Sequence, residues 1–208
     1  LFAVWETLYT TVIATAFAYV IGLPLGVLMV AGEQGGVMPL PRPVMTVLNF
    51  VINILRSVPF LILMVLVIPL SRLIIGTSIG TVATIIPLIV AAFPFVARLV
   101  EASIREVDKG VVEAAQSMGC SPFQIIAKVL IPESRPSLMS GFTTAFITIL
   151  SYGAMAGAIG GGGLGAMSLN LGYQRRMQII LWVSVLVLFW ILPYISALFE
   201  DIKQLFTI

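Results

Sequence analysis

Long apolar stretches separated by short polar segments run through most of this chain of 208 residues. A helix needs about 20 apolar residues to cross the hydrocarbon core of a bilayer. Five stretches come close to that length, at residues 7–31, 57–75, 80–97, 138–159 and 179–199. The pattern therefore predicts an all-α, polytopic membrane protein that crosses the bilayer five times and forms one domain over residues 1–208.

The second stretch is less regular than the other four. Between residues 44 and 75 it contains two asparagines, Arg56 and Pro59. We expect this span to begin after the segment Arg56–Phe60, with Arg56 at the membrane interface and residues 44–55 as an approach segment. A single longer helix that holds Arg56 inside the membrane is the alternative.

Composition supports a lipid environment and removes several classes of function. Hydrophobic residues make up 60% of the chain, charged residues 10%, and the mean hydropathy is +1.12. Soluble domains carry roughly 25% charged residues. The absence of histidine removes His-ligated metal sites and Ser-His-Asp triads, so an intramembrane hydrolase is disfavoured and we expect neither catalytic residues nor a metal site. The net charge of +2 gives no indication of a nucleic-acid partner.

Positive charges are distributed unevenly between the segments that connect the five spans. If the N-terminus lies outside, eight cationic residues lie on the inner side, namely Arg42, Arg56, Arg98, Arg105, Lys109, Lys128, Arg135 and Lys203. Three lie on the outer side, namely Arg72, Arg175 and Arg176. The positive-inside rule favours this orientation. We therefore expect an outside N-terminus, a cytoplasmic C-terminus and a cytoplasmic loop over about residues 98–136.

The centres of the spans carry no charged residue apart from Arg56. Ion-coupled transporters normally need such groups to bind the driving ion. No inverted repeat is visible in the chain either. The sequence thus favours an energy source outside this chain over an ATP-independent channel or secondary transporter.

The cytoplasmic loop contains strong signals for two short helices. Asp108 is suited to cap a first helix over residues 109–118, and Gly119 to end it in the left-handed conformation. Ser121, with Pro122 after it and Gln124 at the third position, predicts a capping box for a second helix. The first helix, at ~15 Å, is too short to cross a bilayer.

The first of these helices has two distinct faces. Val111, Ala115 and Met118 form an apolar stripe, whereas Glu113 and its polar neighbours lie on another face. Such a helix can insert into a groove on another protein. It can equally lie on the lipid headgroups, and the spacing alone does not choose between the two.

The order of residues in the loop resembles a known family motif. Glu113-Ala114-Ala115, three residues, Gly119, nine residues and then Val129-Leu130-Ile131-Pro132 is similar to the EAA loop of bacterial ABC importer permeases. Val129 and Ile131 stand where that family favours isoleucine and leucine, which preserves an apolar contact.

The resemblance implies that the first loop helix is a coupling helix that docks on a separate cytoplasmic ATPase. Glu113 would make a polar contact at the docking face, the two alanines would allow close approach, and Gly119 would make the turn. The implied coupling residues are Val112, Glu113, Ala114, Ala115, Met118, Gly119, Ser121 and Pro122.

Other segments are similar to the methionine-type branch of this family. They are Asn53–Leu70, Gly76–Gly80, Ala92–Glu101 and Gly157–Met167. The resemblance implies import of an amino acid, with methionine as the expected substrate. Another amino acid or an osmoprotectant is the alternative, because permeases for these solutes share the EAA loop.

The family mechanism implies several partners for this chain. They are a second copy of itself, two ATPases that hold the ATP and Mg, an extracytoplasmic substrate-binding protein and the lipid of a bacterial inner membrane; no cofactor is expected in this chain itself. ATP binding would draw the ATPases together and turn the permease outward, and the binding protein would then deliver the amino acid. Because the spans offer no evident charged anchor, selectivity is expected to rest largely with the binding protein.

Small and polar residues in the fourth predicted span follow helical spacing. Thr144, Thr148, Ser151 and Met155 form the candidate translocation pathway. Their hydroxyls can alternatively bond to carbonyls of their own helix or to a neighbouring helix.

Two further features have competing interpretations. The glycines at 153, 157 and 160–163 indicate close helix packing and a connection on the outer side, or a hinge. A phosphate-binding loop is disfavoured because no strand precedes these glycines and no G-K-[ST] ending follows them. Arg98 and Glu101 form either a simple interfacial ion pair or a conformational latch.

Overall fold

The computed structural model describes residues 1–207, with the side chains of residues 192, 198, 199 and 202–207 left aside. Every regular element in this range is helical, which confirms the all-α prediction. The long helices are α1 (Phe2–Ala31), α2 (Arg42–Ser57), α3 (Phe60–Ile75), α4 (Ile85–Arg105), α8 (Arg135–Ala156) and α10 (Gln178–Thr207). The short ones are η1 (Val82–Thr84), α5 (Lys109–Ser117), α6 (Pro122–Ile125), η2 (Ile126–Leu130), α7 (Ile131–Glu133), η3 (Gly157–Ile159), α9 (Gly163–Met167) and η4 (Ser168–Gln174).

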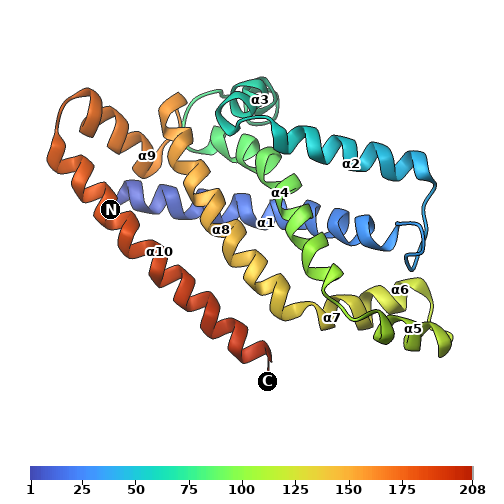
Figure 1. Ribbon diagram of the computed structural model, residues 1–208. Coiled ribbons are helices and arrows are strands. Elements are labelled where there is room, and N and C mark those ends of the chain that lie inside the picture. The colour runs from blue at the N-terminus through green and yellow to red at the C-terminus, as the bar shows by residue number, and fades with distance from the viewer. Residues whose placement is uncertain (208) are drawn as a thin grey trace.

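Helices α1, α4 and α8 form the centre of the molecule (Figure 1). Ala14 and Ala18 of α1, Ala92 of α4 and Ala145 of α8 belong to one buried cluster. Lipid tails are as apolar as the helices, so packing and not the hydrophobic effect holds membrane helices together. Small side chains at the crossings allow the helix backbones the close approach that this packing requires.

The chain passes repeatedly between two ends of the molecule (Figure 1). Helices α1, α4 and α10 run from the end that holds α9 toward the end that holds α5–α7, and α2 and α8 run back. The loop helices α5–α7 therefore lie together at one end, and the glycine-rich connection before α9 lies at the other.

Helices α2 and α3 are separate and meet at an angle of 109°. The break follows from Pro59, because a proline disfavours helical backbone in the residue before it, and Val58 is indeed extended. The alternative of one longer helix through Arg56 is therefore wrong. Arg56 lines a cavity together with Phe95, which lies at the middle of α4, so it sits deeper than the interfacial position expected for it.

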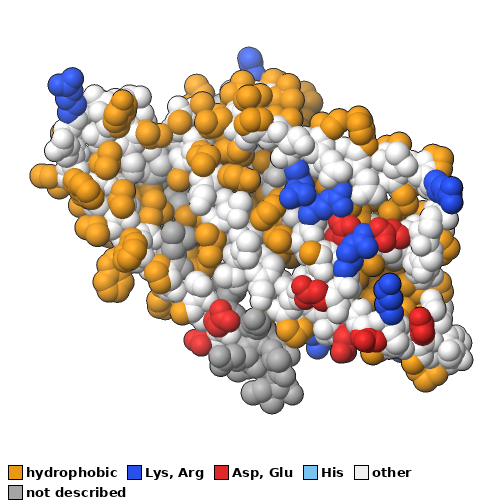
Figure 2. All heavy atoms as spheres, in the orientation of Figure 1, with side chains coloured by type: hydrophobic (Ala, Val, Ile, Leu, Met, Phe, Trp, Pro, Cys, Tyr) orange, Lys and Arg blue, Asp and Glu red, His pale blue; other side chains and the backbone are white. Residues whose placement is uncertain are grey.

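Four helices within residues 1–207 are long and apolar enough to cross a membrane, and the bent α2–α3 pair counts as a fifth if it crosses as one unit. Figure 2 shows apolar side chains spread over α3 and α10, whereas most charged side chains gather at the end with α5–α7. Ile179, Phe189 and Trp190 of α10 are exposed in the single chain. Large apolar surfaces of this kind suit contact with lipid or with another helix.

The helix ends differ from the predicted limits of the loop. Helix α4 continues beyond Ala97 to Arg105, and α8 begins at Arg135, so the inter-helix segment runs from Glu106 to Ser134 and not from 98 to 136. Arg98 does not end the helix, because it pairs with Glu101 one turn further along it.

Candidate coupling and translocation sites

The predicted start and end of the first loop helix are confirmed. The Gly110 N–H donates to the Asp108 carboxylate at 2.6 Å, which caps α5. Gly119 has φ of +78°, and the Cys120 N–H returns to the Ala115 carbonyl at 3.1 Å. The left-handed residue satisfies the last carbonyls of α5 and turns the chain sharply into the next helix.

The capping box of the second loop helix is also present. The Ser121 N–H donates to the Gln124 side chain at 2.9 Å, and the Gln124 N–H donates to the Ser121 hydroxyl at 3.4 Å. Pro122 occupies the first position of α6, where its missing N–H has no helical partner to lose. The two caps hold α5 and α6 in a fixed relation across the Gly119 turn.

The two loop helices divide their side chains between the core and the surface. Ala115 is 2% exposed and packs with Ile125 and Leu130 in the main buried cluster. Val112 is half-buried against the same cluster, whereas Glu113, Ala114, Gly119, Ser121 and Pro122 are exposed. The predicted stripe of Val111, Ala115 and Met118 is not uniformly exposed, because Ala115 packs on the core while the other two side chains are exposed.

Phe123 belongs to the exposed part of the loop, although the sequence analysis did not select it. It is 77% exposed, and Met118 across the turn is 76% exposed. Its position two residues before Ile125 was a usable signal, because residues i and i+2 of a helix do not share a face and Ile125 packs on the core. We call the exposed residues of this tip the coupling surface: Glu113, Ala114, Met118, Gly119, Ser121, Pro122 and Phe123.

The apolar end of the motif anchors the loop to the membrane helices. Leu130 is buried, and Val129 and Ile131 pack against the same cluster, which confirms the apolar contact expected for the two departures from the family pattern. The backbone forms the π-helical turn η2 over Ile126–Leu130 before it enters α7 and α8. The coupling surface is thus joined to α4 and α8 through packed side chains.

Arg98 and Glu101 form an ion pair at 2.6 Å, but the pair is not isolated. Glu101 also binds Arg105 at 2.8 Å, and Arg105 pairs with Glu33 in the α1–α2 connection. Arg98 donates to Asn49 at 2.9 Å and to Asn53 at 2.8 Å on α2. The middle and second half of α2, the C-terminal part of α4 and the α1–α2 connection are therefore held in one polar network.

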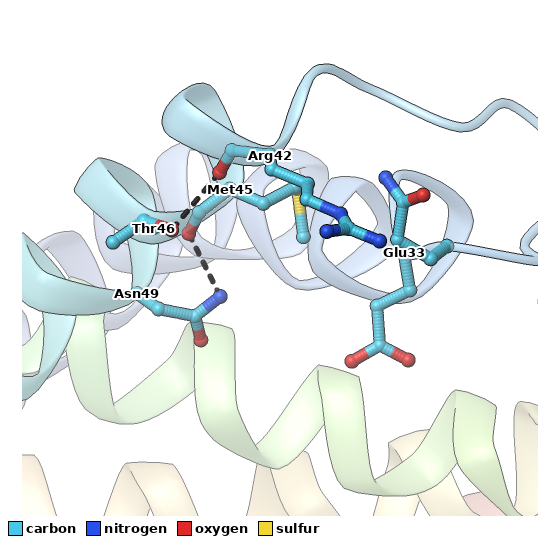
Figure 3. A pocket seen from close by; sticks show the side chains of 6 residues that line it. Glu33, Arg42, Met45, Thr46 and Asn49 are labelled. Atoms are coloured by element: carbon cyan, nitrogen blue, oxygen red, sulfur yellow. Dashed lines mark hydrogen bonds between the residues drawn. The ribbon is translucent and has the colours of Figure 1, made fainter.

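A pocket of about 620 Å³ opens beside this network, between the α1–α2 connection and the start of α2 (Figure 3). Figure 3 shows Arg42 extending toward the connection that carries Glu33. Thr46 and Asn49 donate to the carbonyls of Arg42 and Met45, each at 2.9 Å, so both side chains are bonded to their own helix. Among the described residues no group of three or more cysteine or acidic side chains is placed to hold a metal ion.

The candidate pathway residues lie along one partly open face of α8. Thr144, Ser151 and Met155 are exposed, and Thr148 is half-buried. The three hydroxyls donate to carbonyls four residues back, at 3.0, 2.8 and 3.1 Å. The three hydroxyls are thus bonded to carbonyls of their own helix, which was one of the two alternatives. Figure 2 shows the uncharged polar and backbone atoms of α8 in white, between apolar α10 and the charged end.

The opposite end of the molecule is closed by a polar contact that the sequence analysis missed. The Glu6 carboxylate accepts from the Thr81 hydroxyl at 2.7 Å and from the Gly163 N–H at 2.9 Å. The Thr7 hydroxyl accepts from the Leu164 N–H at 2.9 Å. These bonds join the start of α1 to α9 over a separation of 157 residues, which no local pattern could reveal.

Comparison with known proteins places this arrangement in a family. Residues 22–201 match the model described as Binding-protein-dependent transport system inner membrane component. The chain belongs to this family. It is thus a component of an inner-membrane transport system, and the family inferred from the Glu113–Pro132 motif is confirmed.

Relatives of this family member carry methionine transport names. A Vibrio cholerae protein named Probable D-methionine transport system permease protein MetI is 46% identical over 94% of this chain and 87% of the relative. The D-methionine transport system permease protein MetI of Escherichia coli K12 is 46% identical over 74% of this chain and 70% of the relative.

Solved structures of the same architecture belong to ABC transporters. A chain of the inward-facing MetNI methionine ABC transporter superposes with a TM-score of 0.94 at 39% identity, over 97% of this permease and 93% of that chain. A chain of an amino acid ABC transporter with histidines superposes with a TM-score of 0.78 at 22% identity, which shows the fold alone.

Proposed function

We propose that this chain is the permease subunit of an ATP-driven importer of methionine. The observation that carries the proposal is the coupling surface, which projects from the charged end of the molecule on capped helices and has no role in the internal packing. Membership of the binding-protein-dependent family and the methionine transport names of similar proteins support the substrate class.

The coupling surface docks on a cytoplasmic ATPase subunit in this proposal. Met118 and Phe123 are large apolar side chains held in water-facing positions, which is the form that anchors of protein interfaces take. Glu113 adds a charge beside them. Val112 and Ala115 lie on the side of α5 that faces the core. They pack this helix onto the core and so transmit its displacement to α4 and α8.

Two copies of the chain form the complete pathway. The Thr144, Thr148, Ser151 and Met155 face of α8 leaves polar groups uncovered in the single chain, and it is suited to line a hydrated route at a two-fold axis. Each copy docks one ATPase, which binds ATP and Mg, and an extracytoplasmic binding protein delivers the amino acid at the α9 end. The N-terminus then lies outside and the C-terminus in the cytoplasm.

Uptake measurements on the reconstituted assembly test this proposal. We expect labelled methionine to accumulate in proteoliposomes that contain this chain, its ATPase and its binding protein, and accumulation to stop when ATP is withdrawn. The ATPase is expected to co-purify with the permease at a ratio near 1:1. Uptake that survives ATP depletion but collapses with an ionophore would overturn the proposal in favour of ion-coupled transport, and uptake of another amino acid or an osmoprotectant alone would overturn the substrate.

A further inference from the structure

The break between α2 and α3 leaves a cavity of about 260 Å³ beside the helical core. Arg56 from the end of α2, Phe60 from the start of α3, Phe95 from α4 and Tyr152 from α8 all line it. Phe95 lies at the centre of the 21-residue helix α4, which is about 32 Å long. The cavity, and Arg56 with it, therefore lies well inside the depth that the helices span.

Arg56 is a cation without a fixed counter-charge. It is exposed in the single chain, and the described residues provide it with no ion pair, unlike Arg98 and Arg105. An ionised side chain at this depth is costly against lipid, and such residues face water-filled cavities or functional pathways. Tyr152 follows Thr148 by four residues on α8, so the cavity lies next to the proposed pathway face.

Aromatic side chains form part of the cavity wall. The rings of Phe60 and Tyr152 stack with centroids 4.5 Å apart and planes inclined by 5°. A thioether makes favourable contacts with aromatic rings, and a guanidinium binds a carboxylate through two parallel hydrogen bonds. The cavity thus offers a cation for an α-carboxylate and aromatic surface for a linear apolar side chain.

We propose that this cavity is a transit site for the transported amino acid. Arg56 binds the α-carboxylate of this amino acid, and the side chain of the amino acid packs on Phe60 and Tyr152. The proposal rests on the proposed function, and it adds a selective contact to a permease whose selectivity was expected to rest largely with the binding protein. A single cationic contact at an open site holds the solute in position and still allows it to leave, as conduction requires.

The test uses the complete assembly in proteoliposomes, with methionine uptake measured per ATP hydrolysed. We expect Arg56→Gln to lower this ratio at least tenfold while ATPase stimulation by the loaded binding protein stays within twofold of the wild type. We expect Arg56→Lys to lower it two- to tenfold, because an ammonium keeps the charge but loses the bidentate geometry. Arg42→Gln, at the other end of the same helix, removes the same charge and is expected to leave the ratio unchanged.

The outcomes separate this inference from the function on which it rests. One outcome is that the wild type transports methionine with ATP while an assembled Arg56 variant takes up as much methionine per ATP hydrolysed as the wild type does. In that case the transit site is wrong and the proposed function stands. If the wild type shows no ATP-driven methionine uptake, the proposed function fails and the transit site falls with it. Should Arg56→Gln not assemble with the ATPase, the Lys variant decides, and a wild-type ratio in that variant overturns the transit site.

Discussion

Gly153 of α8 and Gly157, which begins η3 directly after that helix, have different surroundings although they form one small-residue motif. A Cβ atom added at Gly157 would lie 2.2 Å from the Ala166 nitrogen, whereas one added at Gly153 would meet nothing within 4 Å. Gly157 therefore permits the close approach of η3 to α9, which is the packing role predicted from the sequence. Gly153 has no such role within the single chain.

This difference gives a matched pair of substitutions. We expect Gly157→Ala to destabilise the protein by about 1–3 kcal/mol, because overpacking forces backbone to move at a crossing made by main-chain atoms. Gly153→Ala is expected to stay within about 0.5 kcal/mol of the wild type, as a change in open space should. Thermal unfolding of the purified protein in detergent measures both, and equal melting temperatures for the two variants would contradict the assignment.

Glu101 stabilises the polar network around Arg98 and Arg105 more than Glu33 does. Its side chain is 9% exposed and joins two arginines, whereas Glu33 is 43% exposed and joins one. We expect Glu101→Gln to lower the free energy of unfolding by roughly 1.5–3 kcal/mol, since buried hydrogen bonds to charged groups are lost. Glu33→Gln is expected to cost under about 1 kcal/mol because water screens that pair. The same unfolding assay ranks the two, and a larger loss in Glu33→Gln would contradict the network described above.

At the scale of elements, the α5–α6 tip depends on one left-handed residue. Gly119 has φ of +78° with open space around its missing Cβ, so a substitution there is strained by backbone conformation and not by collision. The orientation of the coupling surface thus depends on a conformation that most residues avoid, and not on a close contact.

A pair of substitutions at this turn separates conformation from chemistry. Gly119→Ala is expected to raise the free energy of the left-handed turn by about 1–2 kcal/mol, because alanine disfavours this conformation. The variant is therefore expected to reduce ATP-driven methionine uptake. Gly119→Asn is expected to retain most of the uptake, because asparagine enters that region more readily. Uptake per assembled complex is the measurement, and equal uptake by both variants and the wild type would show that the turn does not set the docking geometry. Glu113→Lys, which reverses a charge on the same surface, should weaken ATPase co-purification.

The whole molecule has a charged end and a glycine-rich end, and only one orientation puts the coupling surface in the cytoplasm. Cys120 is the single cysteine of the chain and lies in the α5–α6 turn, half-buried. Cysteines introduced at exposed Met118 and Tyr173, in a Cys120→Ser background, would report on the two ends. They therefore make a direct test of topology.

We expect a membrane-impermeant thiol reagent added outside intact cells to label Tyr173→Cys and to leave Met118→Cys unmodified. Met118→Cys should react after permeabilisation, and bound ATPase should slow that reaction severalfold by covering the coupling surface. Labelling of Met118→Cys from outside would reverse the proposed orientation. Unchanged labelling in the presence of ATPase would remove position 118 from the docking interface.

Apolar length, charge asymmetry and local caps were enough for the sequence to determine the class of this protein. Local patterns predict the apolar spans, the Asp108 and Ser121 caps and the Gly119 turn. Each of these features depends on residues within a few positions of one another, so neighbouring residues are enough to predict it. The twenty-residue motif Glu113–Pro132 identified the family because its spacing is also local.

Contacts between distant segments were decided only by the tertiary structure. Ala115 turned inward because α5 lies on a core built from α1, α4 and α8. The Glu6 contact with Gly163, the sharing of Glu101 between two arginines, and the placement of Arg56 beside Phe95 and Tyr152 join positions far apart in the chain. Periodicity can show which residues share a face of one helix, but the neighbour of that face is fixed by the packing of all the helices together.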